Sequence, residues 1–144
     1  MSMTCELTYF LGLKVKQLKH GTFLSQLKYV FDLLKKFKME DCKEVTTPIA
    51  TKCLMDSDEV GQQVDLTKYR GLICSFLYLT TSTPNIQLSI CLCARFQSNP
   101  KEWHFKATKR ILKYLKGTTN VGLWYPSDSK VILSGFSDSD YVRC

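Results

Sequence analysis

The sequence predicts an α+β fold with an N-terminal β-hairpin, about four helices and a C-terminal strand pair. Three observations support this prediction. Apolar and charged residues alternate at positions 13–16, a pattern typical of a half-buried strand. Apolar residues recur at helical spacing in several segments between positions 26 and 117. Apolar runs return at positions 121–125 and 131–136, on either side of a turn that contains Pro126.

The N-terminal elements follow from local signals. Residues 7–16 and 22–24 predict two strands joined by a turn at His20-Gly21. Ser25 is the expected N-cap of a helix that ends near Met39. Its core stripe consists of Tyr29, Val30, Leu33, Leu34 and Phe37. Residues 40–64 show neither period and contain Pro48, so we expect a surface linker there.

Three further helices are expected between residues 65 and 117. Asp65 is placed to cap a helix over 66–80, which is apolar on nearly all sides from residue 72 to 79 and therefore expected to be buried. Thr83-Pro84 predicts the start of a second helix that reaches about Phe96. Asn99-Pro100 predicts the start of a third helix, which extends to residue 116 and is closed by Gly117.

Composition narrows the class of protein and of partner. The chain has 144 residues, and its 20 Lys and Arg against 13 Asp and Glu give a net charge of +7. This charge favours a polyanionic partner such as nucleic acid. The uncharged stretch at 71–94 is interrupted by a polar turn with Pro84, which favours two short helices over a membrane span, so no membrane partner is expected.

Cysteine usage and the N-terminus predict an intracellular protein, either cytoplasmic or nuclear. The seven cysteines are an odd number without repeated spacing, which argues against a disulfide framework. Cys74, Cys91 and Cys93 lie in apolar segments and are expected to be buried. The first residues show neither the basic region nor the apolar region of a signal peptide.

The strongest functional signal is a row of cations on the last expected helix. Its members, spaced to share one face, are Lys106, Lys109, Arg110, Lys113 and Lys116. Residues 101–116 hold six basic residues against Glu102, a net charge of +5. Such a face can bind a phosphate backbone without reading sequence, with Lys14 and Lys16 as expected contributors. The alternative is a solvated helix face that keeps the protein soluble.

Metal and catalytic motifs are weak. Asp138 and Asp140 are of the type that binds Mg²⁺, but such a site needs several carboxylates from separate elements, so an exposed acidic turn is favoured. His20 and His104 have no partner at metal-ligand spacing, and Cys91-x-Cys93 is too closely spaced for a zinc site. The sequence contains neither a nucleophile elbow nor a phosphate-binding glycine loop, so we expect no metal or cofactor.

Several motifs in order resemble the reverse transcriptase of Ty1/copia-type retrotransposon Pol polyproteins, and the resemblance covers essentially the whole chain. The family's "YR…GSLLYLT" is similar to Tyr69-Arg70 followed by residues 75–80. Its "H…A.KRILRYLKGT" is similar to His104, Ala107 and residues 109–118. Its "SDADWAG", which opens the RNase H domain, is similar to residues 137–141.

The resemblance implies a domain arrangement. It assigns residues 1–39 to the end of the palm hairpin and the first thumb-like helix, and 40–64 to a linker. It assigns 65–117 to a helical thumb and connection, and 118–144 to the first strands of a truncated RNase H-like domain. Asp138 would match the first metal carboxylate of that domain, whose other ligands are missing, as is the polymerase's metal-binding Tyr-Val-Asp-Asp turn.

The resemblance therefore implies a catalytically incomplete fragment rather than an enzyme, although the parent family uses Mg²⁺. Ser82-Thr83-Pro84-Asn85 departs from the family's Ser-Arg-Pro-Asp, which indicates a truncated, decayed copy. The expected residual activity is sequence-independent binding of duplex nucleic acid or an RNA–DNA hybrid. Unpaired strand edges would favour self-association. The alternatives are an effector-like protein-interaction module without a nucleic-acid role and, least favoured, a nuclease built on Asp138 and Asp140.

Overall fold

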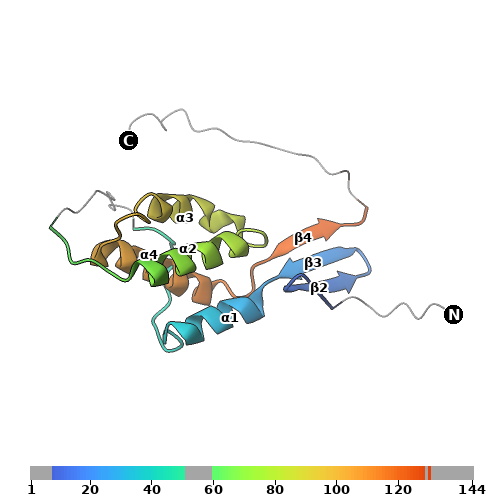
Figure 1. Cartoon of the computed structure of the whole chain (residues 1–144). Helices are drawn as coiled ribbons and strands as arrows, with labels where there is room; N and C mark the ends of the chain where they lie inside the picture. Colours follow the sequence, from blue (N-terminus) through green and yellow to red (C-terminus); the bar gives the residue numbers. More distant parts are fainter. Residues whose placement is uncertain (1–7, 51–59, 129, 131–144) are drawn as a thin grey trace.

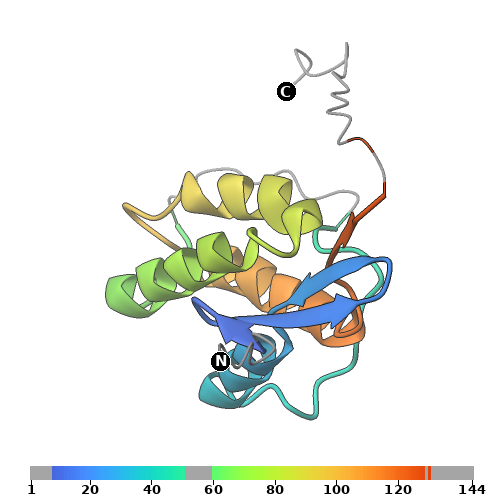
Figure 2. The ribbon, with the colours of Figure 1, turned by 90° about the vertical axis from the view of Figure 1, so that its right-hand side faces the viewer.

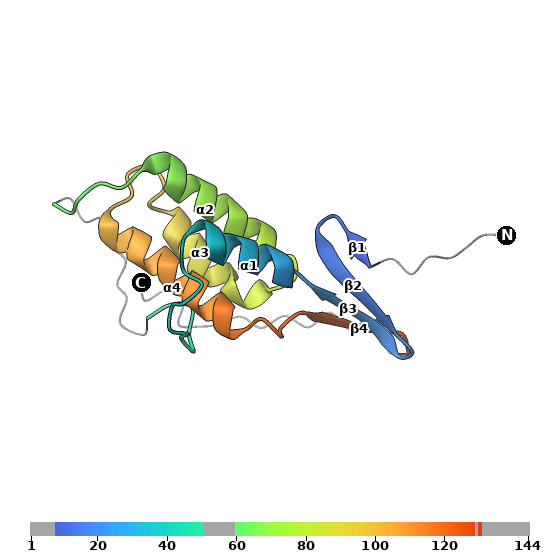
Figure 3. The same ribbon diagram turned by 90° about the horizontal axis from the view of Figure 1, so that it is seen from below.

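A four-stranded antiparallel sheet extends from one end of a group of helices, which confirms the expected α+β class (Figures 1 and 3). The computed structural model describes residues 8–50, 60–128 and 130. Its strands follow the order β1-β2-β3-β4 across the sheet. In Figure 2 the sheet lies in front of the helices, with the hairpin of β2 and β3 nearest to the viewer.

The N-terminal hairpin is confirmed, but its first expected strand is two strands. β1 (Tyr9–Phe10) and β2 (Leu13–Leu18) are separated by a turn in which Leu11 has a φ of 49° and Gly12 a φ of 79°. The Tyr78 hydroxyl of the helix α2 (Leu66–Leu79) donates to the Leu11 carbonyl and occupies the space that a side chain at Gly12 would need. The turn that divides the strand is therefore in contact with a distant helix.

The strand β4 (Leu123–Pro126) completes the same sheet. It pairs with β3 (Gly21–Ser25) in a register that sets Trp124 opposite Phe23. The C-terminal strand thus joins the N-terminal hairpin, because the edge of β3 not used by β2 is open to it. Residues 131–136, the second expected C-terminal strand, lie outside the described residues.

The first helix is shorter than predicted. α1 spans Leu27–Lys36, with Gln26 as its N-cap residue. Ser25, the predicted cap, is instead the last residue of β3, where it pairs with Lys14 of β2. The predicted end near Met39 is also late, because Lys38 adopts a positive φ of 54° and turns the chain.

The start of α2 (Leu66–Leu79) is confirmed, since the Asp65 carboxylate accepts hydrogen bonds from the amides of Thr67 and Lys68 at 2.9 and 3.2 Å. The next expected helix is divided into a 3-10 turn, η1 (Pro84–Ile86), and α3 (Gln87–Ala94). The two segments therefore cover most of the predicted range, which ended at residue 96.

The last helix, α4 (Glu102–Gly117), begins three residues after its predicted cap, Asn99. The cause is a short pairing of residues 100–102 with residues 62–64. Val64 N–H donates to the Pro100 carbonyl at 3.2 Å, and Glu102 N–H donates to the Gln62 carbonyl at 2.9 Å. The chain thus stays extended through Lys101, and Gly117 is the last residue of the helix rather than its cap.

One apolar core joins the helices, with α2 packed on α3 and α4, and α1 on α4. Cys93 is buried in it, as predicted, but Cys74 and Cys91 are exposed because they lie on the outer sides of α2 and α3. Leu77 is 49% exposed, so α2 is buried on one side only. Within the described ranges, none of the helices is long and apolar enough to cross a membrane.

Candidate nucleic-acid interface

The cations of α4 differ in what they contact. Lys106 is exposed and forms an ion pair with Glu102 one turn earlier, at 3.3 Å. The Lys109 ammonium lies 4.9 Å from the centre of the Phe105 ring. Both contacts are at the surface, where such pairs hold a side chain only weakly. Lys106 and Lys109 therefore remain accessible to an anionic partner.

Arg110 and Lys116 bind the segment that follows α1. The Arg110 Nη2 donates to the Thr47 hydroxyl at 2.9 Å, and the Lys116 Nζ donates to the Cys42 carbonyl at 2.8 Å. Residues 40–50 contain no helix or strand, and these two bonds hold them against α4. Two of the five predicted phosphate ligands thus hydrogen-bond to a distant segment of the chain, which sequence spacing alone did not indicate.

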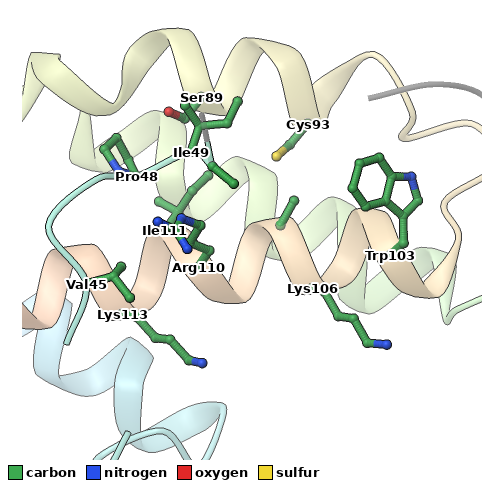
Figure 4. A pocket seen from close by; sticks show the side chains of 12 residues that line it. Val45, Pro48, Ile49, Ser89, Cys93, Trp103, Lys106, Arg110, Ile111 and Lys113 are labelled. Atoms are coloured by element: carbon green, nitrogen blue, oxygen red, sulfur yellow. The ribbon is translucent and has the colours of Figure 1, made fainter. Parts of the chain in front are cut away.

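A cavity of about 270 Å³ opens beside this helix, between α3, α4 and residues 45–50 (Figure 4). Its wall is mostly apolar and includes Ile49, Ala107 and Ile111. In Figure 4 the Arg110 guanidinium points toward Ile49 and Ser89, while the ammonium groups of Lys106 and Lys113 extend outward at the rim. Lys113 is half-buried, and within the described part of the chain no hydrogen bond of its ammonium group is recorded.

Lys14 and Lys16 lie on β2, in the sheet and not on the α4 face, so the predicted cations fall into two groups. Both are exposed and, because side chains alternate along a strand, both point to one face of the sheet. Phe23 lies between Lys16 and Trp124 in the pairing of β2, β3 and β4, so these three side chains form a row on that face.

Trp124 is an exposed aromatic residue that the sequence analysis did not include among its candidate binding residues. It is 45% exposed and stands next to Phe23 on the same face as the two lysines. An aromatic side chain beside cations is typical of surfaces that bind nucleic acid. The signal was hidden because about 100 positions of sequence separate Phe23 from Trp124, so their pairing follows from the fold and not from a local pattern.

No metal centre is found in the part of the chain that the structure describes. No group of three His, Cys, Asp or Glu residues there is placed to hold a metal ion. Asp138 and Asp140 lie outside the described residues. His104 is buried and stacks on Phe96, with a ring-centre distance of 4.1 Å, and its Nδ1 accepts a hydrogen bond from the Lys101 amide at 3.0 Å. It therefore supports the start of α4.

A described residue with a strongly raised pKa, Tyr69, lies in the core and not at the cations. Burial, followed by the nearby Cys93, raises the pKa of Tyr69 well above its usual value. The Tyr69 hydroxyl donates to the Cys93 carbonyl at 2.7 Å. This hydrogen bond joins α2 to α3, so Tyr69 stabilises the helical core rather than a binding surface.

Comparison with known proteins finds relatives among transposon polyproteins. The chain is 38% identical over 137 residues to the retrovirus-related Pol polyprotein from transposon RE1 of Arabidopsis thaliana, covering 95% of this chain and 9% of that protein. It is 33% identical over 140 residues to the corresponding polyprotein from transposon TNT 1-94 of Nicotiana tabacum, covering 90% of this chain and 10% of that protein.

A further relative is an uncharacterised mitochondrial protein of Arabidopsis thaliana, 35% identical over 136 residues, which cover 94% of this chain and 56% of that protein. The chain thus spans about a tenth of the transposon polyproteins and about half of the mitochondrial relative. No family model matches the chain. No solved structure matches it either.

Proposed function

Since the chain is homologous to one part of the Pol polyproteins of copia-type retrotransposons, we propose that it binds duplex nucleic acid or an RNA–DNA hybrid through the phosphate backbone, without reading sequence and without catalysing a reaction itself. The observation that carries this proposal is the outer face of α4, where Lys106, Lys109 and Lys113 follow one another at successive turns. Cations at this spacing can follow a row of phosphates.

The internal bonds of Arg110 and Lys116 sharpen the proposal. Because these two side chains bind residues 42–47, they are less available to a phosphate than the three lysines. The three lysines therefore supply most of the phosphate contacts, while Arg110 and Lys116 hold residues 42–47 against α4. Lys14 and Lys16, beside Phe23 and Trp124, form a second contact surface on the sheet.

The test is binding to a blunt RNA–DNA hybrid and to double-stranded DNA at several salt concentrations. Neutralising Lys106, Lys109 and Lys113 to Gln should weaken binding and reduce the slope of log affinity against log salt by about 2.7, since each phosphate contact contributes about 0.9. The matched control replaces three exposed cations elsewhere, Lys19, Lys28 and Arg95, with Gln and removes the same net charge.

The proposal requires the control to keep most of the salt slope. Equal losses in both triple variants would mean that net charge alone attracts the nucleic acid, and would refute a dedicated face. Absence of binding by a chain whose circular dichroism shows folded helices would refute the function altogether. The effector-like interaction module of the sequence analysis would then be the next function to test.

A further inference from the structure

A groove lies on the surface between the end of α1, the first turns of α2 and the first half of α4. Its volume is about 680 Å³, within the range of about 300–1,000 Å³ that is usual for binding sites. Its wall is mostly apolar and includes the half-buried rings of Phe37 and Phe105. Gly71 of α2 also lines the groove and is exposed, and a side chain added there would meet nothing within 4 Å. The groove is therefore open to an apolar group from outside the chain.

Positive charge surrounds the groove. Among the described residues that line it, four lysines stand against one acidic residue, Asp65, which gives a net charge of +3. Asp65 already accepts hydrogen bonds from the first amides of α2. In the described part of the chain none of the four lysines forms an ion pair. Three of them are exposed and the fourth, Lys109, is half-buried, so their ammonium groups are accessible to an anionic partner; the four are Lys36, Lys38, Lys68 and Lys109.

The positions of two ammonium groups favour one class of anion. The Lys109 Nζ lies 4.9 Å from the centre of the Phe105 ring, and the Lys36 Nζ lies 6.0 Å from the centre of the Phe37 ring. Both rings also pack against the core. A nucleic-acid base that stacked on either ring would therefore displace a cation. A carboxylate can instead pair with these ammonium groups where they lie, while an aliphatic side chain enters beside Gly71.

We propose that this groove docks a short acidic amphipathic helix of a partner protein. Apolar residues on one face of that helix would lie against Phe37, Gly71 and Phe105, and its carboxylates would pair with the surrounding lysines. Amphipathic helices bind apolar grooves in this way, and complementary charge adds specificity and speeds association. The site does not depend on nucleic-acid binding, because three of its four lysines lie outside the row on α4.

The experiment titrates the ¹⁵N-labelled chain with synthetic peptides and follows the Gly71 amide signal by NMR. The first peptide has about 14 residues, or about four turns of helix, with Leu recurring at i and i+4 and with Glu and Ala elsewhere. A second peptide replaces Glu by Gln, and a third replaces Leu by Ala. We expect saturable shifts with the first peptide and binding weaker by about tenfold or more for the other two. No saturable shift with the first peptide would overturn the proposal.

A substitution that fills the groove tests its position. Gly71→Trp places an indole there and leaves every lysine unchanged, so it should weaken the first peptide by about tenfold or more without changing affinity for the RNA–DNA hybrid. The matched control is Leu77→Trp, at an exposed position of α2 that does not line the groove. Unchanged peptide binding in a folded Gly71→Trp would place the peptide elsewhere and overturn the proposal, whatever the hybrid result.

A second variant tests the charge of the groove. Replacing Lys36, Lys38 and Lys68 with Gln leaves Lys109 and the row on α4 intact, and should weaken the first peptide by about tenfold or more. The control of the hybrid experiment, with Gln at three exposed cations elsewhere, removes the same net charge and should weaken it by less than about threefold. Equal losses would mean that net charge alone attracts the peptide, and would overturn the proposal. Tighter binding of oligothymidylate that is lost in Gly71→Trp would assign the groove to single-stranded nucleic acid and would also overturn it.

Discussion

The helices and the sheet of this chain bury their side chains to very different degrees. Each helix contributes buried apolar residues to one core, and Leu72, Phe76 and Ile111 are essentially inaccessible. Among the residues of the four described strands, β1 to β4, only Gly21 and Ser25 are buried, while Tyr9, Trp124 and Tyr125 are about half exposed. The helices therefore carry most of the stability, and the sheet depends on pairing and on a few links to the helices.

The largest expected effect comes from removing a side chain at the centre of the helical core. Phe76→Ala should lower the free energy of unfolding by about 3–5 kcal/mol, because Phe76 of α2 is fully buried and the surrounding helices cannot close the space. Urea unfolding followed by circular dichroism measures this loss. The matched control is Phe31→Ala on the outer side of α1, where the side chain is 50% exposed and a loss below about 1 kcal/mol is expected.

A smaller effect is expected at the link between the two regions. The Gln26 side chain, at the junction of β3 and α1, donates to the Tyr78 carbonyl at 3.3 Å and accepts from the Ser82 hydroxyl at 2.6 Å. Gln26→Leu should cost about 1–3 kcal/mol, because it removes the acceptor of a buried hydroxyl.

This substitution tests whether the sheet depends on the helices. When Gln26 is replaced, amide hydrogen exchange should accelerate more in β2 and β3 than in α2. Thr81→Val is the milder control. It removes the 3.2 Å bond of the exposed Thr81 hydroxyl to the Gln26 Oε1 and the 2.9 Å bond of that hydroxyl to the Tyr78 carbonyl, but leaves the bonds of Gln26 to Tyr78 and Ser82 in place. A uniform change of exchange in both regions would mean that sheet and helices open together.

A hydrogen bond inside the core gives the third prediction. Tyr69→Phe should cost about 0.5–1.5 kcal/mol at neutral pH, since the Cys93 carbonyl loses this donor. Urea unfolding at pH 7 measures this cost. A retained stability at pH 7 would contradict the view that this bond helps to hold α2 on α3.

Tyr69 also makes the stability of the folded chain depend on pH. In the unfolded chain a tyrosine ionises near pH 10, whereas burial raises the pKa of Tyr69 in the folded chain. Above about pH 10 the folded state therefore binds more protons, and its stability falls as the pH rises. Tyr69→Phe should flatten this fall, while the exposed Tyr125→Phe should leave it unchanged.

How much was predictable from sequence differs between the same two regions. The helices carry local signals, such as Asp65 before α2 and the repeated apolar residues of α4, and all four helices lie close to their expected places. The starts of α1 and α4 were displaced because Ser25 and residues 100–102 pair with distant segments. The spacing of the α4 cations predicted their common helix but not the bonds of Arg110 and Lys116 to residues 42–47, nor the cavity beside them.

The pairing of β4 with β3 was likewise not predictable from local sequence signals. A substitution that disturbs this pairing gives the smallest predicted loss of global stability. A methyl group at Gly122 would overlap the Leu24 carbonyl oxygen and the Phe23 ring, so Gly122→Ala should separate β4 from β3. Because few side chains of the sheet are buried, the helices should lose less than about 1 kcal/mol of stability. Hydrogen exchange should report lost protection in β3 and β4 with α2 unchanged.

Gly71→Ala is the matched substitution in the other region. Gly71 lies on the exposed side of α2, and a methyl group there meets nothing within 4 Å. Since alanine favours the helix, this variant should gain about 0.5–1 kcal/mol, a change of opposite sign from the same added methyl group. If Gly122→Ala destabilised α2 as strongly as the sheet, the helices would depend on β4, and the contrast between a self-sufficient helical core and a dependent sheet would be wrong.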